Sequence, residues 1–316
     1  MKPPWSTNQL KRLGDALRDD AVVPSNLPDY AEVIAWYDDL AARVHNGIVG
    51  LHLDGIPGVK SIEISSRAKT IDTLREKLRR EFPIRLPSIQ DIAGVRINAD
   101  MSLLTQRDIA SSIAGHYGHT REAIRDLRTQ HHSGYRAVHV WLRLAGGRVE
   151  VQVRTTLQSE WANAYEALAD LIGREIRYNQ EPNLSGLRPS LAKTFDGFHK
   201  ELQTFSFGFI RTQELVRVSD SILDSVPDFF ERPGAESLRE EFVSTTGDLL
   251  QGALDIANAQ ETPPAVHATL LELRSRPRSV EWARAAQDPI RGATQAWLRG
   301  LRYDLDKLRA ESKMEK

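Results

Sequence analysis

The sequence predicts an α+β protein in which a mixed β-sheet flanked by helices precedes an all-helical C-terminal lobe. Alternating polar and apolar residues, typical of strands, occur only in the first half of the chain. Apolar residues at helical spacing separate these strands, and from about residue 186 onward only helical spacing is found. Because 316 residues exceed one average domain, we expect an N-terminal extension at residues 1–28, a first domain at 29–180 and a helical lobe at 186–316.

Composition and charge exclude several classes of protein. The chain has no cysteine, which excludes disulfides, thiolate catalysis and cysteine-bound metal sites and is compatible with a reducing cytoplasm. Its nine histidines show no paired spacing of the kind that binds metal. No stretch approaches the roughly 20 apolar residues that span a bilayer, and the start lacks the apolar core of a secretory signal. We therefore expect a cytoplasmic protein with no membrane partner.

The first predicted elements are a helix, a strand and a second helix. From residue 29 to 51, apolar residues recur at steps of three and four, which predicts an amphipathic helix. Residues 59–65 alternate and predict a strand. A helix over about 71–82 follows, and Pro83 ends it because proline cannot continue a helix.

The next elements complete the predicted sheet. Residues 91–97 form a short apolar run typical of a buried strand, and a helix is expected at about 105–117. Residues 133–140 and 149–155 predict two adjacent strands, and the spacing over 157–172 predicts a helix. The order is therefore mixed α and β throughout the first domain.

The second half of the chain predicts helices alone. Residues 179–183 are expected to link it to the first domain, and long stretches at 236–260 and 280–310 have helical periodicity. The last of these carries one apolar stripe, formed by Ile290, Ala293, Trp297, Leu301, Leu305 and Leu308.

Two acidic residues are candidate ligands of a metal ion. Side chains alternate along a strand, so Glu150 projects together with Gln152 and Arg154. Asp91 begins the preceding strand, and carboxylates on neighbouring strands suit Mg²⁺ held together with phosphate oxygens. The alternative is that each is an acid at a strand end that faces water.

A cluster of basic residues is a candidate site for a triphosphate. Arg67 and Lys69 precede a helix that carries Lys77 and Arg80 one turn apart. The formal net charge of −1 means that any contact with nucleic acid must come from a local patch such as residues 67–85. The alternative is a solvated helix face on which neighbouring glutamates are the partners.

Tyr135 and His139 are four residues apart on a predicted strand and are expected to point the same way. The phenol ring would then be available to stack on a nucleobase. The alternative is that Tyr135 is half-buried packing.

Taken in order, five short runs resemble the synthetase domain of the RelA/SpoT family. The resemblance covers about residues 29–178. The runs are residues 66–70 followed by Lys77 and Arg80, residues 91–96, residues 134–139, residues 150–155 and residues 161–170. It implies a nucleotidyltransferase-like domain that transfers the β,γ-pyrophosphate of ATP to the ribose 3′-hydroxyl of a guanine nucleotide, making the alarmone (p)ppGpp and releasing AMP.

The resemblance also implies roles on the ATP side. Arg67 and Arg96 would sandwich the adenine, and Lys69, Lys77 and Arg80 would hold the phosphates. Such chemistry needs positioning and cancellation of charge more than covalent help.

The remaining implied roles concern the metal and the acceptor. Asp91 and Glu150 would bind Mg²⁺, and Glu150 would also take the proton from the attacking 3′-hydroxyl, which Gln152 would orient. Tyr135 would stack on the acceptor base, and His139 would contact acceptor phosphate.

One departure leaves the acceptor open. The family usually leads into its tyrosine with Pro-Lys-x-Asn-Gly-Tyr, whereas residues 130–135 contain neither lysine nor asparagine. The lysine would ordinarily meet acceptor phosphate, so GDP or GTP is placed in doubt as the acceptor. The chain is also too short for the hydrolase and regulatory modules of long members, so we expect a stand-alone synthetase.

Two further functions stay open beside alarmone synthesis. A neighbouring group of toxic small members makes ppApp or pyrophosphorylates the 3′-CCA end of tRNA, and an antitoxin protein neutralises each of them. The partners to consider are therefore ATP, then GDP, GTP or tRNA as the acceptor, an antitoxin, and a second copy of the chain. A nucleotide- or RNA-binding module that has lost catalysis is the lesser alternative, because both Asp91 and Glu150 are present.

Overall fold

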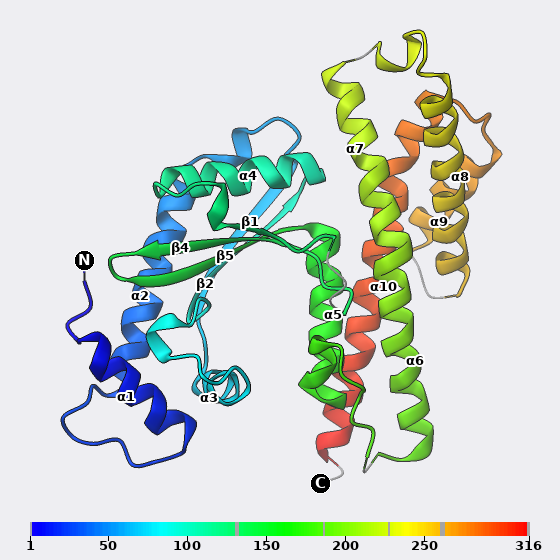
Figure 1. Cartoon of the computed structure of the whole chain (residues 1–316). Helices are drawn as coiled ribbons and strands as arrows, with labels where there is room; N and C mark the ends of the chain where they lie inside the picture. Colours follow the sequence, from blue (N-terminus) through cyan, green and yellow to red (C-terminus); the bar gives the residue numbers. More distant parts are fainter. Residues whose placement is uncertain (1, 130–132, 186, 227, 260–262, 315–316) are drawn as a thin grey trace. The chain divides into compact units, whose positions relative to one another are not determined.

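A computed structural model describes the whole chain except residues 1, 130–132, 186, 227, 260–262, 315 and 316 (Figure 1). The position of the missing lysine, residue 131, therefore lies outside the described residues, whereas Ser133, which stands in place of the family's asparagine, is described. Backbone contacts divide the chain into two compact units, which are described separately. The sheet unit comprises residues 1–101, 105–127 and 137–154, and the helical unit comprises residues 102–104, 128–136 and 155–316.

The sheet unit is built on five strands in the spatial order β1-β2-β5-β4-β3. The strands are β1 (Ser61–Ala68), β2 (Ala93–Asp100), β3 (Ile124–Asp126), β4 (Val138–Leu144) and β5 (Gly147–Thr155). β1 pairs with β2, β3 with β4 and β4 with β5, each antiparallel. The predicted mixed α and β order of this half of the chain is confirmed.

Helices cover the apolar face of this sheet. They are α1 (Thr7–Arg18), α2 (Tyr30–Val49), α3 (Ile71–Arg80) and α4 (Leu103–His116), and Figure 1 shows α2 and α4 beside the strands. Valines of β2, β4 and β5 share one buried core with α2 and α4. Since side chains alternate along each strand, burying the valines leaves the polar residues of β5 on the opposite face.

Helix α1 lies inside the predicted N-terminal extension. A capping box starts it, in which Ser6 accepts from the backbone of Gln9 while the Gln9 side chain accepts from the backbone of Ser6. Its Leu10 and Leu13 are buried in the sheet unit's core. The predicted domain boundaries stay a prediction.

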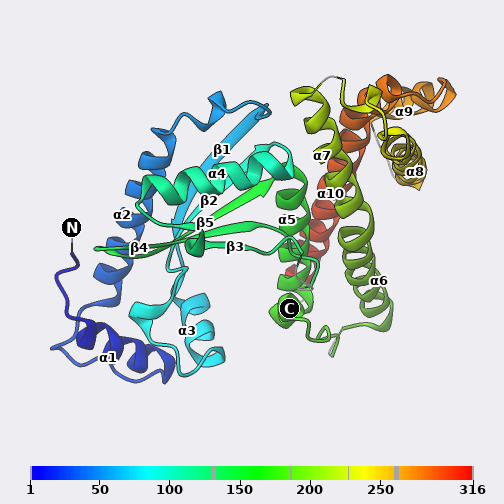
Figure 2. The same ribbon diagram turned by 45° about the horizontal axis from the view of Figure 1, so that its top comes forward.

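The helical unit holds the remaining helices. They are α5 (Thr156–Ile172), α6 (Pro189–Phe205), α7 (Arg211–Ser225), α8 (Glu236–Ala259), α9 (Pro264–Ser275) and α10 (Val280–Met314). A π-helical turn (Ser206–Ile210) joins α6 to α7 in one continuous rod, which Figure 2 shows along its length. Short 3₁₀ turns lie at Leu53–Gly55, Leu86–Ser88, Arg121–Ala123, Arg174–Tyr178 and Phe229–Glu231.

The predicted helical lobe is confirmed in the described residues. Trp297 and Leu301 of the predicted stripe are buried in a core that α10 shares with α5 and α6. Helix α5 ends at Gly173, whose φ of +105° is a conformation that favours glycine. Every helix that the structure describes is too short or too polar to cross a lipid bilayer.

Two details of the predicted strands are wrong. β4 begins at Val138, because Ser133 and Gly134 have positive φ values of 51° and 84° that a strand does not contain. Tyr135 and His139 therefore do not share a strand face. Asp91 lies two residues before β2. Strand alternation, which would put its side chain on the other face of the sheet from Arg96, therefore does not apply to it.

Candidate active site

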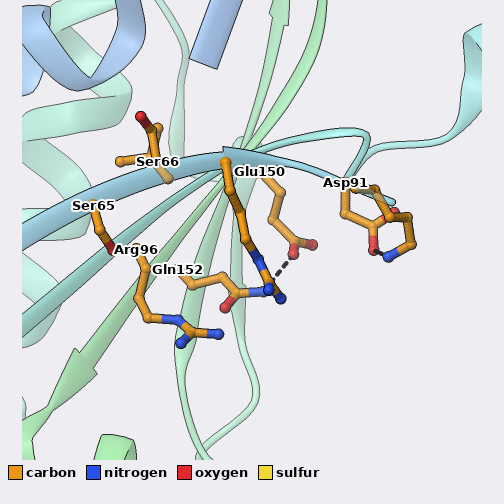
Figure 3. A pocket seen from close by; sticks show the side chains of 10 residues that line it. Ser65, Ser66, Asp91, Arg96, Glu150 and Gln152 are labelled. Carbon is orange, nitrogen blue, oxygen red and sulfur yellow. Dashed lines mark hydrogen bonds and ion pairs between the residues drawn. The ribbon is translucent and has the colours of Figure 1, made fainter. Parts of the chain in front are cut away.

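A cavity of about 250 Å³ opens on the polar face of the sheet unit. Ten residues line it: Ser65, Ser66, Arg67, Lys69, Asp91, Gly94, Val95, Arg96, Glu150 and Gln152. Figure 3 shows the side chains of Arg96, Glu150 and Gln152 extending toward the same space. The cavity thus combines carboxylates, guanidinium groups and an amide within one small volume.

Strand pairing explains why these side chains meet. Residues directly opposite each other in an antiparallel pair lie on the same face. Arg67 is opposite Gly94, and Ser65 is opposite Arg96, across β1 and β2. β5 lies beside β2 in the sheet and contributes Glu150 and Gln152 to the same face.

Asp91 is held by two ammonium groups. Lys69 Nζ lies 2.7 Å from its Oδ2, and Lys77 Nζ lies 2.8 Å from its Oδ1. Burial would raise the pKa of the Asp91 carboxyl, but the charges of Lys69 and Lys77 outweigh it and lower the pKa. Asp91 is consequently an anion at neutral pH, and it gathers two cations at the edge of the cavity.

Glu150 accepts hydrogen bonds on both carboxylate oxygens. Trp141 Nε1 donates to Oε1 at 3.2 Å, and Gln152 Nε2 donates to Oε2 at 2.8 Å. His139 Nδ1 also lies 3.2 Å from Oε1. Burial alone would raise the pKa of Glu150, but His139, Gln152 and Lys77 stabilise the anion and lower the pKa to about 2. Glu150 is therefore anionic over the whole neutral range.

The donor set fits a hard cation that a bound phosphate helps to hold. Asp91 and Glu150 line the same cavity, and they are close enough that the negative charge of Glu150 opposes the lowering of the Asp91 pKa. Mg²⁺ is commonly bound by one or two carboxylates with substrate phosphates and water, so two carboxylates suffice. Among the described residues, no group of three or more His, Asp or Glu side chains is arranged to hold a metal ion.

A comparison with known families decides what this cavity belongs to. The family model described as "Region found in RelA / SpoT proteins" matches residues 66–171. Residues 66–171 are a RelA/SpoT region. Except for Ser65, every residue that lines the cavity lies within it. The resemblance to the RelA/SpoT family predicted from the sequence is confirmed for these residues.

Relatives of this chain include two mycobacterial proteins. Uncharacterized proteins of Mycobacterium tuberculosis and Mycobacterium bovis are each 54% identical to this chain over 181 residues, which is 57% of this chain and 65% of each relative. The chain thus spans slightly less than two thirds of those relatives. Among solved structures, small alarmone synthetase 1 from Bacillus subtilis is similar, with 19% identity, a TM-score of 0.41, and coverage of 62% of this chain and 98% of that one. The same synthetase bound to its product pppGpp gives 16% identity, a TM-score of 0.41, and coverage of 63% and 98%.

The RelA/SpoT region brings most of the predicted site residues together. Those that line the cavity are Arg67, Lys69, Asp91, Arg96, Glu150 and Gln152. Lys77 joins them through Asp91, and His139 joins them through Glu150. Arg80 differs, because its guanidinium donates to Glu81 at 2.9 Å. Tyr135 is not among the residues that line the cavity and belongs to the helical unit.

Sequence reasoning missed one polar side chain of the RelA/SpoT region, Trp141, which donates to Glu150. Trp141 follows His139 by two residues on β4 and lies opposite Glu150 in the strand register. Strand alternation would have found it, since a residue two positions from His139 shares its face. Ser65 and Ser66 line the cavity as well; Ser66 begins the first run of the resemblance but was assigned no role, and Ser65 lies just before that run.

Proposed function

We propose that this protein is an ATP-dependent pyrophosphokinase, which transfers the β,γ-pyrophosphate of ATP to the ribose 3′-hydroxyl of a guanine nucleotide and releases AMP. One observation carries the proposal: Asp91 with its two lysines, Glu150 with Gln152, and two arginines meet in one cavity of a RelA/SpoT region. Transfer of this kind needs cations around the phosphates, acids for a metal and a positioned hydroxyl, and the cavity supplies each of these residue types.

The arginine spacing supports a nucleobase between Arg67 and Arg96. Arg67 is opposite Gly94, and Arg96 is two residues further along β2, so the two arginines are diagonal neighbours on one face. Diagonal neighbours in an antiparallel pair lie about 7–8 Å apart. That is about twice the optimal contact distance of ~3.5–4 Å between stacked atoms. Gly94 has no side chain to fill the gap, which leaves room for an adenine ring.

The lysines and acids support a site for the triphosphate. Lys69 and Lys77 would move from Asp91 to phosphate oxygens, while Asp91 and Glu150 would hold Mg²⁺. When bound, Mg²⁺ supplies cancellation of the charge that develops on the transferred group. Arg80 is not among the residues that line the cavity, and its guanidinium donates to Glu81.

The hydrogen bonds of Glu150 favour an electrostatic role over a strong basic one. An efficient general base has a pKa near the working pH, and a carboxyl with a pKa of about 2 is a weak proton acceptor. We propose that the negative charge of Glu150 is its main contribution. Gln152 bridges Glu150 and Arg154, with Arg154 donating to its Oε1 at 2.8 Å, and this fixes its amide for orienting a hydroxyl.

The deciding experiment follows the γ-phosphate of ATP. The protein is incubated with ATP labelled at the γ-phosphate, Mg²⁺, and in separate reactions GDP, GTP, ATP alone or deacylated tRNA. We expect label on GDP or GTP together with an equal amount of AMP. Label on tRNA or on an adenine nucleotide would instead establish the toxin-like alternatives.

Variants separate this chemistry from a contaminating activity. Asp91→Asn and Glu150→Gln should abolish transfer, whereas Glu32→Gln, on the exposed side of α2, should leave it unchanged. Label transferred to no acceptor, with ATP binding intact, would replace the proposed enzyme by a nucleotide-binding module.

A further inference from the structure

Within the helical unit, the segment that carries Tyr135 is hydrogen-bonded at its first residue, Ser133, to Asn179. The Ser133 backbone N–H donates to Asn179 Oδ1 at 2.6 Å, and the Ser133 hydroxyl donates to the same oxygen at 2.8 Å. The Asn179 backbone N–H in turn lies 3.1 Å from Ser133 Oγ. Both residues have positive φ, 51° and 59°. The two turns therefore hold each other in conformations that isolated residues seldom adopt.

The next residue, Gly134, is hydrogen-bonded to the π-helical turn. Ser206 Oγ donates to the Gly134 carbonyl at 2.5 Å, and Ser206 is buried. A side chain on Gly134 would bring a Cβ to 2.8 Å from the Trp161 ring and 3.1 Å from Ser206 Cβ. Gly134 is thus pressed between α5 and the π-helical turn, where its φ of +84° also requires glycine.

Arg136, the residue after Tyr135, contacts the same π-helical turn. Arg136 Nε donates to the Ser206 carbonyl at 3.3 Å, and its guanidinium lies 5.6 Å from the centre of the Phe207 ring. A further guanidinium nitrogen donates to the Arg128 carbonyl. Arg136 is only 5% exposed, so these contacts are shielded from water.

Tyr135 lies between these fixed residues and is itself half-buried against the core of α5 and α6. We propose that Asn179 and Ser206 are positioning residues, which fix Tyr135 in the conformation that binds the acceptor nucleotide. The inference rests on the proposed function, in which Tyr135 stacks on the acceptor base. Asn179 and Ser206 both lie outside residues 66–171, so the helical unit contributes to acceptor recognition through residues that the RelA/SpoT match does not contain.

The physical reason is preorganisation. Each backbone residue that is ordered only on binding costs roughly 1–2 kcal/mol of conformational entropy, which weakens affinity. A segment fixed beforehand avoids that cost. The contacts touch no residue of the cavity, so their loss should affect the acceptor and spare ATP.

The first test uses Asn179→Gly, because glycine is unstrained at the φ of Asn179. With GDP as the probe, or whichever acceptor the wild-type protein labels, we expect the KM for the acceptor to rise about tenfold, equivalent to about 1.4 kcal/mol. The KM for ATP and kcat at saturating acceptor should stay within about twofold. Asn179→Asp keeps the accepting oxygen and should restore the acceptor KM.

Asn183→Gly is the matched control. Asn183 Oδ1 accepts from the backbone N–H and the hydroxyl of Ser185, as Asn179 Oδ1 does from Ser133, but Asn183 and Ser185 are both exposed. Its KM values should not change.

The second test uses Ser206→Ala, with Thr212→Ala as its control. Thr212 is on the same rod, and its hydroxyl donates to the Gly208 carbonyl, four residues earlier in the chain, at 2.8 Å. Hydrogen exchange of a peptide covering residues 133–136 gives a readout that does not depend on activity. We expect exchange there to quicken in Asn179→Gly and Ser206→Ala, and in neither control.

The outcomes separate the two hypotheses. A wild-type protein that labels no acceptor overturns the proposed function, whatever the exchange data show. A wild-type protein that is active, with an acceptor KM unchanged in Asn179→Gly despite faster exchange, overturns the positioning role alone. An equal rise in the KM for ATP would also overturn it, because general loss of structure would then explain the effect.

Discussion

The cavity of the sheet unit and the Tyr135 segment of the helical unit are built in opposite ways. In and beside the cavity, oppositely charged side chains neutralise one another: Lys69, which follows β1, and Lys77 of α3 both pair with Asp91, which precedes β2. In the Tyr135 segment, Asn179 and Ser206 bind backbone groups that lie 46 and 72 residues away in the chain. Charge can be placed by strand alternation, whereas the shape of a loop depends on distant partners. Substitutions should therefore affect catalysis in the first region and stability or acceptor binding in the second.

The largest expected effect tests the catalytic side of this comparison. Glu150→Gln keeps the size of the side chain but removes its charge, so we expect transfer to fall by at least about 10³-fold, or about 4 kcal/mol. The fold should persist, and circular dichroism checks that. Activity within tenfold of the wild type would mean that the cavity is not the reaction centre.

The pH dependence of stability should differ in sign between Glu150 of the sheet unit and Glu214 of the helical unit. The pKa of Glu150 is about 2 in the folded protein and about 4.5 when unfolded, so its stabilisation is complete above about pH 4.5 and is lost as pH falls toward 2. A shift of this size corresponds to roughly 3 kcal/mol. Asp91, whose pKa is also lowered, acts in the same direction.

Glu214 of α7 gives the opposite sign, because burial raises its pKa despite a hydrogen bond from Thr155. Its folded state prefers the proton, so stability falls as pH rises through the ordinary range of glutamate. Denaturant unfolding of Glu150→Gln and Glu214→Gln between pH 3 and 7 measures both. Glu150→Gln should lose less stability in acid than the wild type, and Glu214→Gln should be the more stable variant at neutral pH. Parallel pH curves for all three proteins would contradict the comparison.

The two predicted phosphate ligands of α3, Lys77 and Arg80, should behave differently. Lys77→Met removes a partner of Asp91 and a cation from the cavity edge, and we expect kcat/KM for ATP to fall about 10²-fold, or about 2.7 kcal/mol. Arg80→Met should change it less than about threefold, because Arg80 donates to Glu81. Steady-state kinetics with varied ATP measures both. Equal losses of kcat/KM in the two variants would indicate that Arg80 also contacts the phosphates of ATP.

Gly134→Ala tests the Tyr135 segment through stability. The new Cβ would meet the Trp161 ring, and the alanine backbone would have to adopt a φ of +84°. We therefore expect a loss of about 2 kcal/mol in the free energy of unfolding. Urea denaturation followed by tryptophan fluorescence measures it. An unchanged midpoint would show that the segment gives way easily, which would undermine the positioning role of Ser206.

The smallest expected effect has the reverse sign. Gly197 is inside α6, and a Cβ there would meet no atom within 4 Å. Gly197→Ala should therefore stabilise the helical unit by about 0.5–1 kcal/mol. The same urea experiment compares the two glycines. A loss of stability in Gly197→Ala would mean that this face of α6 is covered.

Most of the cavity could be predicted from the sequence because strand alternation is a local rule. Glu150 and Gln152 alternate with buried valines, and that pattern alone puts them on the polar face. Asp91 could be proposed as a ligand, but its position could not, since the start of β2 at Ala93 depends on pairing with β1. Helix α1 was overlooked although Ser6 and Gln9 form a recognisable capping box.

The Tyr135 segment could not be derived in the same way. A Ser-Gly-Tyr run is compatible with a strand, a bulge or a turn, and the positive φ of Ser133 depends on Asn179. Which nearby acceptor Trp141 or Arg80 donates to likewise depends on packing, which the sequence pattern does not give. Sequence patterns thus predicted which residues are polar and on which face, but not the long-range hydrogen bonds that orient them.

The double pairing of Asp91 has a thermodynamic consequence. Lys69 and Lys77 are bound to the same carboxylate, so any cation that replaces them releases two ammonium groups at once. Those groups then attract a polyanion more strongly, and a polyanion that takes them exposes Asp91 to the cation. The two affinities are therefore linked by one coupling free energy, and each ligand must raise the affinity for the other by the same factor.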